Sequence, residues 1–192
     1  MVHKEMLSTC CFLGHRTIDE TGTMKERLYE IIEKLITEEN IDTFLFGSKS
    51  RFDDVCLEVV TRIKEEYPYI RRVYVRSSFP YINENYREYL LKIYDDTYYP
   101  EKIIGSGRAS YVERNFEMIN KSRFCVFYYD ENYSPDNRKS GTKTAFDYAT
   151  KHKKEIINIF KWLYTPNEFS FKWQSPLRQS TPHKTSYFFN SQ

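Results

Sequence analysis

Apolar positions along the chain follow two periods in turn, a short continuous run typical of a buried strand and a helical repeat of three or four residues. A strand is predicted at 9–13, and a helix at 23–38 follows it. The order then repeats, with a strand at 42–47, a helix at 52–67 and a strand at 70–76. Strands that alternate with helices in this way predict a parallel sheet with right-handed crossovers.

Residues 77–110 interrupt this alternation and contain a predicted helix at 84–94. A connection of this length is either a lid or binding loop, or an excursion that serves only packing, and the pattern does not separate the two. Beyond it, a helix, a strand, a helix and a strand are predicted at 110–122, 123–130, 142–154 and 155–160.

The predicted fold class is therefore α/β, a Rossmann-like, doubly wound and mainly parallel sheet of five strands flanked by helices. We expect one domain over residues 1–160, with the excursion at 77–110 as part of it. Residues 161–192 form an aromatic and polar tail without clear periodicity. An ordered arm, an oligomer contact and a partly disordered segment all stay open for this tail.

The charge balance of the chain gives no overall electrostatic field that would attract a nucleic acid or an anionic membrane. Its 192 residues include 29 basic and 27 acidic side chains, which leave a net charge of +2. We therefore expect no strong nucleic-acid signal and no membrane partner, and any anion site must be local.

The cysteines and the N-terminus point to a reducing compartment. Cys10, Cys11, Cys56 and Cys125 form no CxxC pair, and three of them lie in or beside predicted strands. Buried thiols are favoured over disulfides or zinc ligands, so no metal site is predicted. The N-terminus lacks the apolar core of a signal peptide, and no apolar stretch approaches the ~20 residues of a membrane span. These features predict a cytoplasmic protein.

The predicted topology brings four segments of the chain to one edge of the sheet. Five strands with a long excursion after the third fit the order 3-2-1-4-5, which reverses between the first and fourth strands. Ligands of open α/β sheets bind beyond the carboxyl ends of the strands, near such a reversal. The loops at 14–16 and 47–52 and the segment 130–142 emerge there, and the start of the helix at 110–122 returns to the same edge.

Glycines, hydroxyl groups and cations in these segments indicate a phosphate site. Gly14, Gly47 and Gly141 permit close backbone approach, and each precedes a predicted helix whose N-terminal amides favour an anion. Each feature alone is more typical of a turn, a helix cap or a solvated face, but together they favour a phosphorylated, sugar-bearing ligand. The predicted ligand-binding residues are Gly14, His15, Arg16, Gly47, Ser48, Lys49, Ser50, Arg51, Asp53, Arg114, Asn115, Asp130, Ser140, Gly141, Thr142 and Lys143.

Catalytic residues are not assigned by the sequence. Nothing matches the phosphate-binding pattern GxxxxGK[ST] or the dinucleotide pattern GxGxxG. Glu113, Asp53 and His15 are candidates, although a carboxylate beside an arginine is more often a structural ion pair and His15 can simply orient a ligand. A ligand base has two candidate stacking surfaces, namely the tyrosines at 128–129 and those of the 79–99 excursion.

Four motifs, in order over roughly residues 9–160, resemble the SLOG superfamily, which is named after the Smf/DprA proteins and the LOG enzymes. They are CCFLGHR, FGSKSRFDD, YVERNFEMINKSRFCVFYYD and SGTKTAFDYATKHKKEIINIF. The best match is the small bacterial single-domain branch. The resemblance implies a Rossmann-like sheet that binds nucleotides or nucleotide-derived molecules at the loops described above. Some members cleave nucleoside monophosphates, and others sense an ADP-ribose-derived signal.

One departure from the family pattern bears on activity. The LOG-type pattern PGGxGTxxE places a glutamate after its Gly-Thr, whereas Thr144, Ala145 and Phe146 occupy this region here and RKS replaces Pro-Gly-Gly. Our leading hypothesis is a homo-oligomeric sensor or sequestering protein that needs no cofactor and binds an ADP-ribose-like or cyclic-nucleotide-like ligand. The alternatives are a nucleoside-phosphate or N-glycosidic hydrolase that uses Glu113 or Asp53, and an assembly protein with a vestigial pocket.

Overall fold

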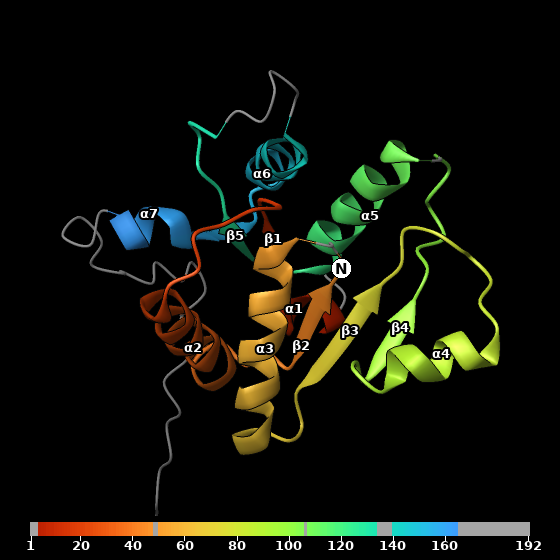
Figure 1. Cartoon of the computed structure of the whole chain (residues 1–192), viewed down its shortest axis with the longest axis horizontal. Helices are drawn as coiled ribbons and strands as arrows, with labels where there is room; N and C mark the ends of the chain where they lie inside the picture. Colours follow the sequence, from red (N-terminus) through yellow and green to blue (C-terminus); the bar gives the residue numbers. More distant parts are fainter. Residues whose placement is uncertain (1–3, 48–49, 106, 134–139, 165–192) are drawn as a thin grey trace, which may run out of the picture.

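The computed structural model describes residues 4–47, 50–105, 107–133 and 140–164. Helices and strands alternate along most of this chain (Figure 1). The strands are β1 (Thr9–Gly14), β2 (Thr43–Phe46), β3 (Arg71–Val75), β4 (Asp96–Tyr98), β5 (Phe124–Tyr128) and β6 (Glu155–Asn158). The helices are α1 (Lys4–Leu7), α2 (Gly22–Thr37), α3 (Arg51–Glu66), α4 (Glu84–Leu91), α5 (Arg108–Lys121), α6 (Gly141–Lys151) and α7 (Ile159–Tyr164).

The described strands form one parallel sheet in the order β4-β3-β2-β1-β5-β6. The predicted order is confirmed for five of them, and the α/β class with a parallel sheet flanked by helices holds. The predicted number of five strands is wrong, because the excursion after β3 contributes β4 at the sheet edge. This strand pairs Val73 with Asp96 and Val75 with Tyr98, and its three half-buried residues are too few to show a period.

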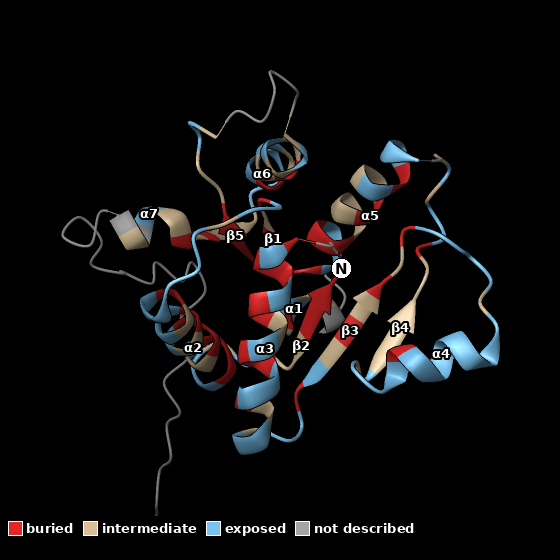
Figure 2. Cartoon of the chain, in the orientation of Figure 1, coloured by how far each residue is buried: buried red, intermediate tan, exposed pale blue. Residues whose placement is uncertain are grey.

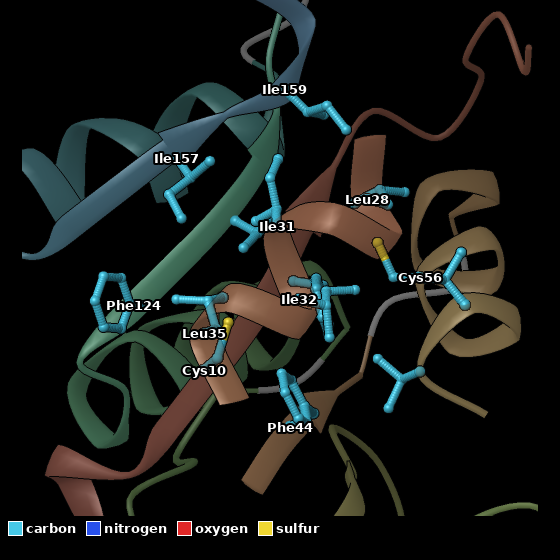
Figure 3. Packing of buried hydrophobic residues seen from close by; sticks show 14 of the residues in the cluster. Cys10, Leu28, Ile31, Ile32, Leu35, Phe44, Cys56, Phe124, Ile157 and Ile159 are labelled. Carbon is cyan, nitrogen blue, oxygen red and sulfur yellow. The ribbon is translucent and has the colours of Figure 1, made fainter. Parts of the chain in front are cut away.

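Alternating side chains divide the apolar core between the two faces of the sheet. Cys10 and Phe44 belong to the cluster under α2, α3 and α7, whereas Cys11 and Leu45 belong to the cluster under α5 and α6. Figure 3 shows the first cluster, in which Leu28 and Ile32 of α2 pack on Phe44 and Cys56. Burial of this kind stabilises the fold by roughly 25 cal/mol per Å² of apolar surface.

The helices differ in how much of their surface they bury. Six residues of α2 and seven of α3 are buried, but Leu90 is the only buried residue of α4 (Figure 2). The four cysteines are buried free thiols, as the sequence indicates. Within the described ranges, no helix has the length and apolar character needed to cross a membrane.

The sheet order reverses between β1 and β5, because β1 leads through α2 to β2 on one side while β5 lies on its other side. The strands run parallel and their registers align Gly14 with Tyr128 and Phe46 with Tyr74. Their carboxyl ends, and the loops that follow, therefore meet at one edge. We call this edge, with the loops after β1, β2 and β5, the carboxyl edge.

Candidate functional site

Backbone hydrogen bonds join the loops of the carboxyl edge. The amide of His15, after β1, donates to the carbonyl of Tyr128 at the end of β5 over 3.2 Å. The amide of Arg51, the first residue of α3, donates to the carbonyl of Arg16 over 3.0 Å. The loop after β1 is thus fixed to both of its neighbours at the point where the strand order reverses.

The side chain of His15 makes a second link to the loop after β5. It is buried, and its Nε2 lies 3.0 Å from the amide nitrogen of Asp130. Burial lowers the pKa of His15, while the carbonyl and carboxylate of Asp130 oppose this shift. The same Nε2 lies 3.3 Å from the carbonyl oxygen of Asp130, so it accepts the Asp130 amide hydrogen or donates to this carbonyl according to the tautomer. Tyr133 lies against the ring with centroids 4.1 Å apart. His15 therefore positions two loops rather than presenting a free Nε2 as a base.

Two of the three predicted glycines make room for protein side chains. A Cβ on Gly14 would lie 2.4 Å from the ring of Phe52, and one on Gly47 would lie 2.7 Å from Cδ of Arg114 and 2.9 Å from Sδ of Met118. Real Cβ atoms do not approach other atoms this closely. Gly141 differs, because a Cβ there would meet nothing within 4 Å. Only Gly141 of the three leaves open space beside its backbone.

Arg114 is nearly buried and supports the loop after β2. Its Nη1 donates to the carbonyl of Gly47, and its Nε donates to Oδ1 of Asn115 over 3.1 Å. Burial lowers the pKa of Arg114, and the negative charge of Asp53 acts in the opposite direction. The guanidinium remains charged at neutral pH and places a positive charge against the backbone of Gly47. Arg114 and Asn115 thus reach the carboxyl edge as predicted by topology.

The N-termini of α3 and α6 point to the same edge. Ser50 caps α3 by accepting the amide hydrogen of Asp53 at 3.2 Å, and Ser140 caps α6 by accepting that of Lys143 at 3.4 Å. The amides of Gly141 and Thr142 donate no hydrogen bond to any residue that the structure describes. They are available to an anion, which the helix dipole also favours.

The predicted cations differ in whether acidic side chains already neutralise them. Arg51 lies on the outer side, where its Nε donates to Glu20 over 2.7 Å and its Nη1 pairs with Glu58 at 3.4 Å. Lys143 pairs with Asp147 one helical turn away at 3.0 Å. Arg16 is exposed and forms no ion pair with any described residue. Ser48 and Lys49 lie outside the described residues.

The candidate catalytic carboxylates are held by the protein. Oε2 of Glu113 accepts the amide hydrogens of Ile104 and Gly105, both over 2.9 Å, so this side chain fixes the loop before α5. Asp53 is buried in the first turn of α3. Oδ1 of Asp130 accepts the amide hydrogen of Asn132 over 2.8 Å. None of these contacts resembles an acid and base placed about a reacting bond.

The aromatic side chains of the edge do not all face a ligand. Tyr128 is buried between the rings of Phe52 and Phe160, and Tyr129 packs on Phe146 with centroids 4.6 Å apart. The tyrosines of the excursion differ, because Tyr81, Tyr86 and Tyr89 are exposed. Tyr86 and the half-buried Tyr99 lie near Arg76, a residue that sequence reasoning missed. Its position directly after β3, on the predicted carboxyl edge, is the signal that would have found it.

A hollow of about 590 Å³ lies elsewhere, on the outer side of α2 and α3. Lys25, Glu58 and Arg62 are among its lining residues, and Lys25 pairs with Glu58 at 2.8 Å. The charged side chains that line this hollow are therefore largely paired with one another. None of the predicted ligand-binding residues that the structure describes lines it.

The parallel sheet, the reversal beside β1 and the glycine loops at the carboxyl edge define a Rossmann-like protein of the SLOG type. A family model described as the YspA SLOG family (YpsA) matches residues 15–161. The chain belongs to this family, which confirms the resemblance seen in the sequence motifs. No curated protein matches the chain.

A solved structure with a similar fold is that of DNA processing protein A from Helicobacter pylori, whose title describes a single-stranded DNA binding mode. The TM-score is 0.52 at 16% identity, and the match covers 79% of this chain and 64% of that chain. The chain thus spans less than two thirds of that protein. Our expectation of no strong nucleic-acid signal is wrong, because it rested on net charge alone and a protein of this fold binds single-stranded DNA.

Proposed function

We propose that the chain binds a nucleotide-derived phosphorylated ligand at the carboxyl edge and acts as a sensor or sequestering protein. The ligand class is ADP-ribose-like or cyclic-nucleotide-like. One observation carries the proposal. Arg16, which has no acidic partner among the described residues, lies in a loop that is hydrogen-bonded to the start of α3 and to the end of β5. At the same edge, the first amides of α6 donate to no described residue.

The cations of this edge differ in burial and in ion pairing, and the difference fits a phosphate ligand. Arg114 gives the Gly47 loop a buried positive charge, while Arg16 offers an exposed guanidinium that has no ion-pair partner in the described part of the chain. A guanidinium and helix N-terminal amides both match the geometry of phosphate oxygens. Arg51 and Lys143 are already paired and contribute less to such a site.

The proposal is tested by calorimetric titration of AMP, ADP-ribose and cyclic AMP into the wild type and an Arg16→Ala variant. We expect Arg16→Ala to raise the Kd about tenfold, since a charged hydrogen bond contributes roughly 1.5 kcal/mol. Arg27→Ala is the matched control, because Arg27 is exposed on α2 and pairs with Glu30 in its own helix. Equal affinities for wild type and Arg16→Ala would place the site elsewhere.

Hydrolysis of a nucleoside phosphate is the alternative that the family resemblance leaves open. It is less favoured, because Glu113 already accepts two backbone amide hydrogens and Asp53 is buried. Release of free base from AMP that is lost in Glu113→Gln would support it. An assembly role for the C-terminal tail concerns residues 161–192, of which 161–164 belong to α7 and 165–192 lie outside the described residues.

Single-stranded DNA is a second candidate ligand, and the fold shared with DNA processing protein A favours it. A phosphodiester would use the same amides and the same arginine as a free nucleotide. Fluorescence anisotropy of a labelled oligo(dT) strand separates the two, because a strand-binding protein would prefer it over AMP and lose affinity steeply with salt.

A further inference from the structure

Four tyrosines and one arginine gather beside the carboxyl ends of β3 and β4, next to the proposed phosphate site. We call Tyr74, Arg76, Tyr86, Tyr99 and Tyr111 the tyrosine–arginine cluster. Its members come from β3, α4, α5 and the segments that follow β3 and β4. Residues far apart in the sequence are thus brought together by the excursion that adds β4 to the sheet.

Arg76 is the charged centre of this cluster. Its amide donates to the carbonyl of Tyr98, and its Nη1 donates to the carbonyl of Phe79 over 2.6 Å. Its Nε is buried without a hydrogen-bond partner, and the side chain forms no ion pair with a carboxylate in the described part of the chain. Burial lowers its pKa, yet an arginine stays protonated at neutral pH. Its positive charge is therefore not neutralised by an acidic side chain.

Aromatic rings lie near this charge and near the neighbouring Arg114, and one accessible ring lies beside each arginine, Tyr86 near Arg76 and Tyr111 near Arg114. Arg76 lies 5.9 Å from the ring centroid of Tyr99, and the hydroxyls of Tyr86 and Tyr74 lie close enough to affect its pKa. Tyr86 is 41% exposed and Tyr111 is 45% exposed, although each is large and largely apolar. Exposed rings beside arginines that have no carboxylate partner among the described residues form a surface on which a planar base can stack while its phosphate meets a guanidinium.

The cluster is joined to the proposed phosphate site through Arg114. Its guanidinium holds the carbonyl of Gly47 and lies 5.7 Å from the ring centroid of Tyr111. The register pairs Phe46 with Tyr74, so Arg76 follows β3 beside the loop that follows β2. One ligand can therefore contact the loop after β2 and the tyrosine–arginine cluster together.

We propose that the tyrosine–arginine cluster binds a nucleobase and its adjoining phosphate. This inference rests on the proposed function and adds the location of the base, which is on the β3–β4 side of the sheet rather than on Tyr128 and Tyr129. A free nucleotide and a nucleotide unit within a single strand share this chemistry, so the experiment includes both.

The experiment compares AMP, ribose 5-phosphate and a labelled oligo(dT) strand on the wild type and on Tyr86→Ala/Tyr111→Ala. Wild type should bind AMP more tightly than ribose 5-phosphate, because the base stacks. The double variant should lose about 5- to 150-fold in AMP affinity and bind ribose 5-phosphate unchanged, as expected from the contribution of one stacked base. Tyr86→Phe/Tyr111→Phe should retain AMP binding, since the rings remain.

Tyr69→Ala is the matched control, because Tyr69 is 62% exposed and lies before β3 at the opposite edge of the sheet. Unchanged thermal unfolding of the double variant excludes a folding defect. A double variant that binds AMP and oligo(dT) like the wild type, while Arg16→Ala binds less, overturns the cluster and leaves the proposed function standing. A loss in the double variant but not in Arg16→Ala supports the cluster and overturns the phosphate site. No binding by wild type overturns both.

Tighter binding of oligo(dT) than of AMP, lost in the double variant, identifies the strand as the source of the base. Tighter binding of AMP, lost in the double variant, identifies the free nucleotide. Either result supports the cluster, because the stacked base and its phosphate are common to both.

Discussion

At the scale of single residues, Gly47 is required by packing beneath its loop. A Cβ at this position would meet Cδ of Arg114 at 2.7 Å and Sδ of Met118 at 2.9 Å. Sequence reasoning attributed the glycine to a ligand and did not foresee this packing, because the contacting residues of α5 are more than sixty positions away in the sequence. The glycine lets Arg114 reach the Gly47 carbonyl, so its effect on a ligand is indirect.

Gly47→Ala should therefore lower the free energy of unfolding by about 1–3 kcal/mol, because overpacking forces Arg114 and Met118 to move. Gly141→Ala serves as the control, since its new Cβ meets nothing within 4 Å, and we expect a change within about 0.5 kcal/mol. Urea denaturation of both variants measures the difference. Equal midpoints for the two would contradict the packing role of Gly47.

The predicted cations show what residue types alone cannot reveal. Arg16 and Arg51 look alike in the sequence, yet Arg51 is neutralised by Glu20 and Glu58 while Arg16 has no acidic partner among the described residues. The pairing depends on how the loop after β1 and the helix α3 are placed in space. Arg76 was missed for a related reason, because β4 and α4 create its surroundings.

At the scale of elements, the periodic segments were predictable and the short ones were not. The helix predicted at 23–38 is α2 (Gly22–Thr37), and the strand predicted at 123–130 is β5 (Phe124–Tyr128). Apolar spacing is strong in both. In contrast, β4 has three residues, and α7 begins at Ile159 inside an apolar run that resembles the end of a strand.

The link between the loops after β1 and β5 should make stability depend on pH. Burial lowers the pKa of His15 in the folded state, so the unfolded state binds more protons below about pH 6.5. The contribution of neutral His15 is thus complete above that pH and is lost as the pH falls toward the lower folded pKa. The measurement is the free energy of unfolding at about pH 7.5 and about pH 5.

His15→Gln removes this titration and keeps a side-chain oxygen that can accept the Asp130 amide hydrogen. The wild type should lose more stability than His15→Gln over this pH range, because all other titrating groups are shared. Equal losses in the two proteins would show that His15 is not held neutral in the folded state.

At the scale of the whole molecule, the topology predicts a ligand site at the carboxyl edge before any side chain is considered. The order β4-β3-β2-β1-β5-β6 reverses beside β1, and the loops after β1, β2 and β5 are hydrogen-bonded at that point. This arrangement followed from the alternation of strands and helices in the sequence. The partner class did not follow from net charge, because local charges such as Arg16, Arg76 and Arg114 decide what the edge attracts.

The central claim is that the carboxyl edge binds a phosphorylated nucleotide, and amide chemical shifts test it most directly. In a titration of ¹⁵N-labelled wild-type protein with ADP-ribose, we predict the largest shifts at His15, Arg16, Gly141 and Thr142, and smaller shifts at Arg76 and Tyr111. Shifts confined to the outer side of α2 and α3, around Lys25 and Arg62, or no shifts at millimolar ligand for either ADP-ribose or AMP, would contradict it.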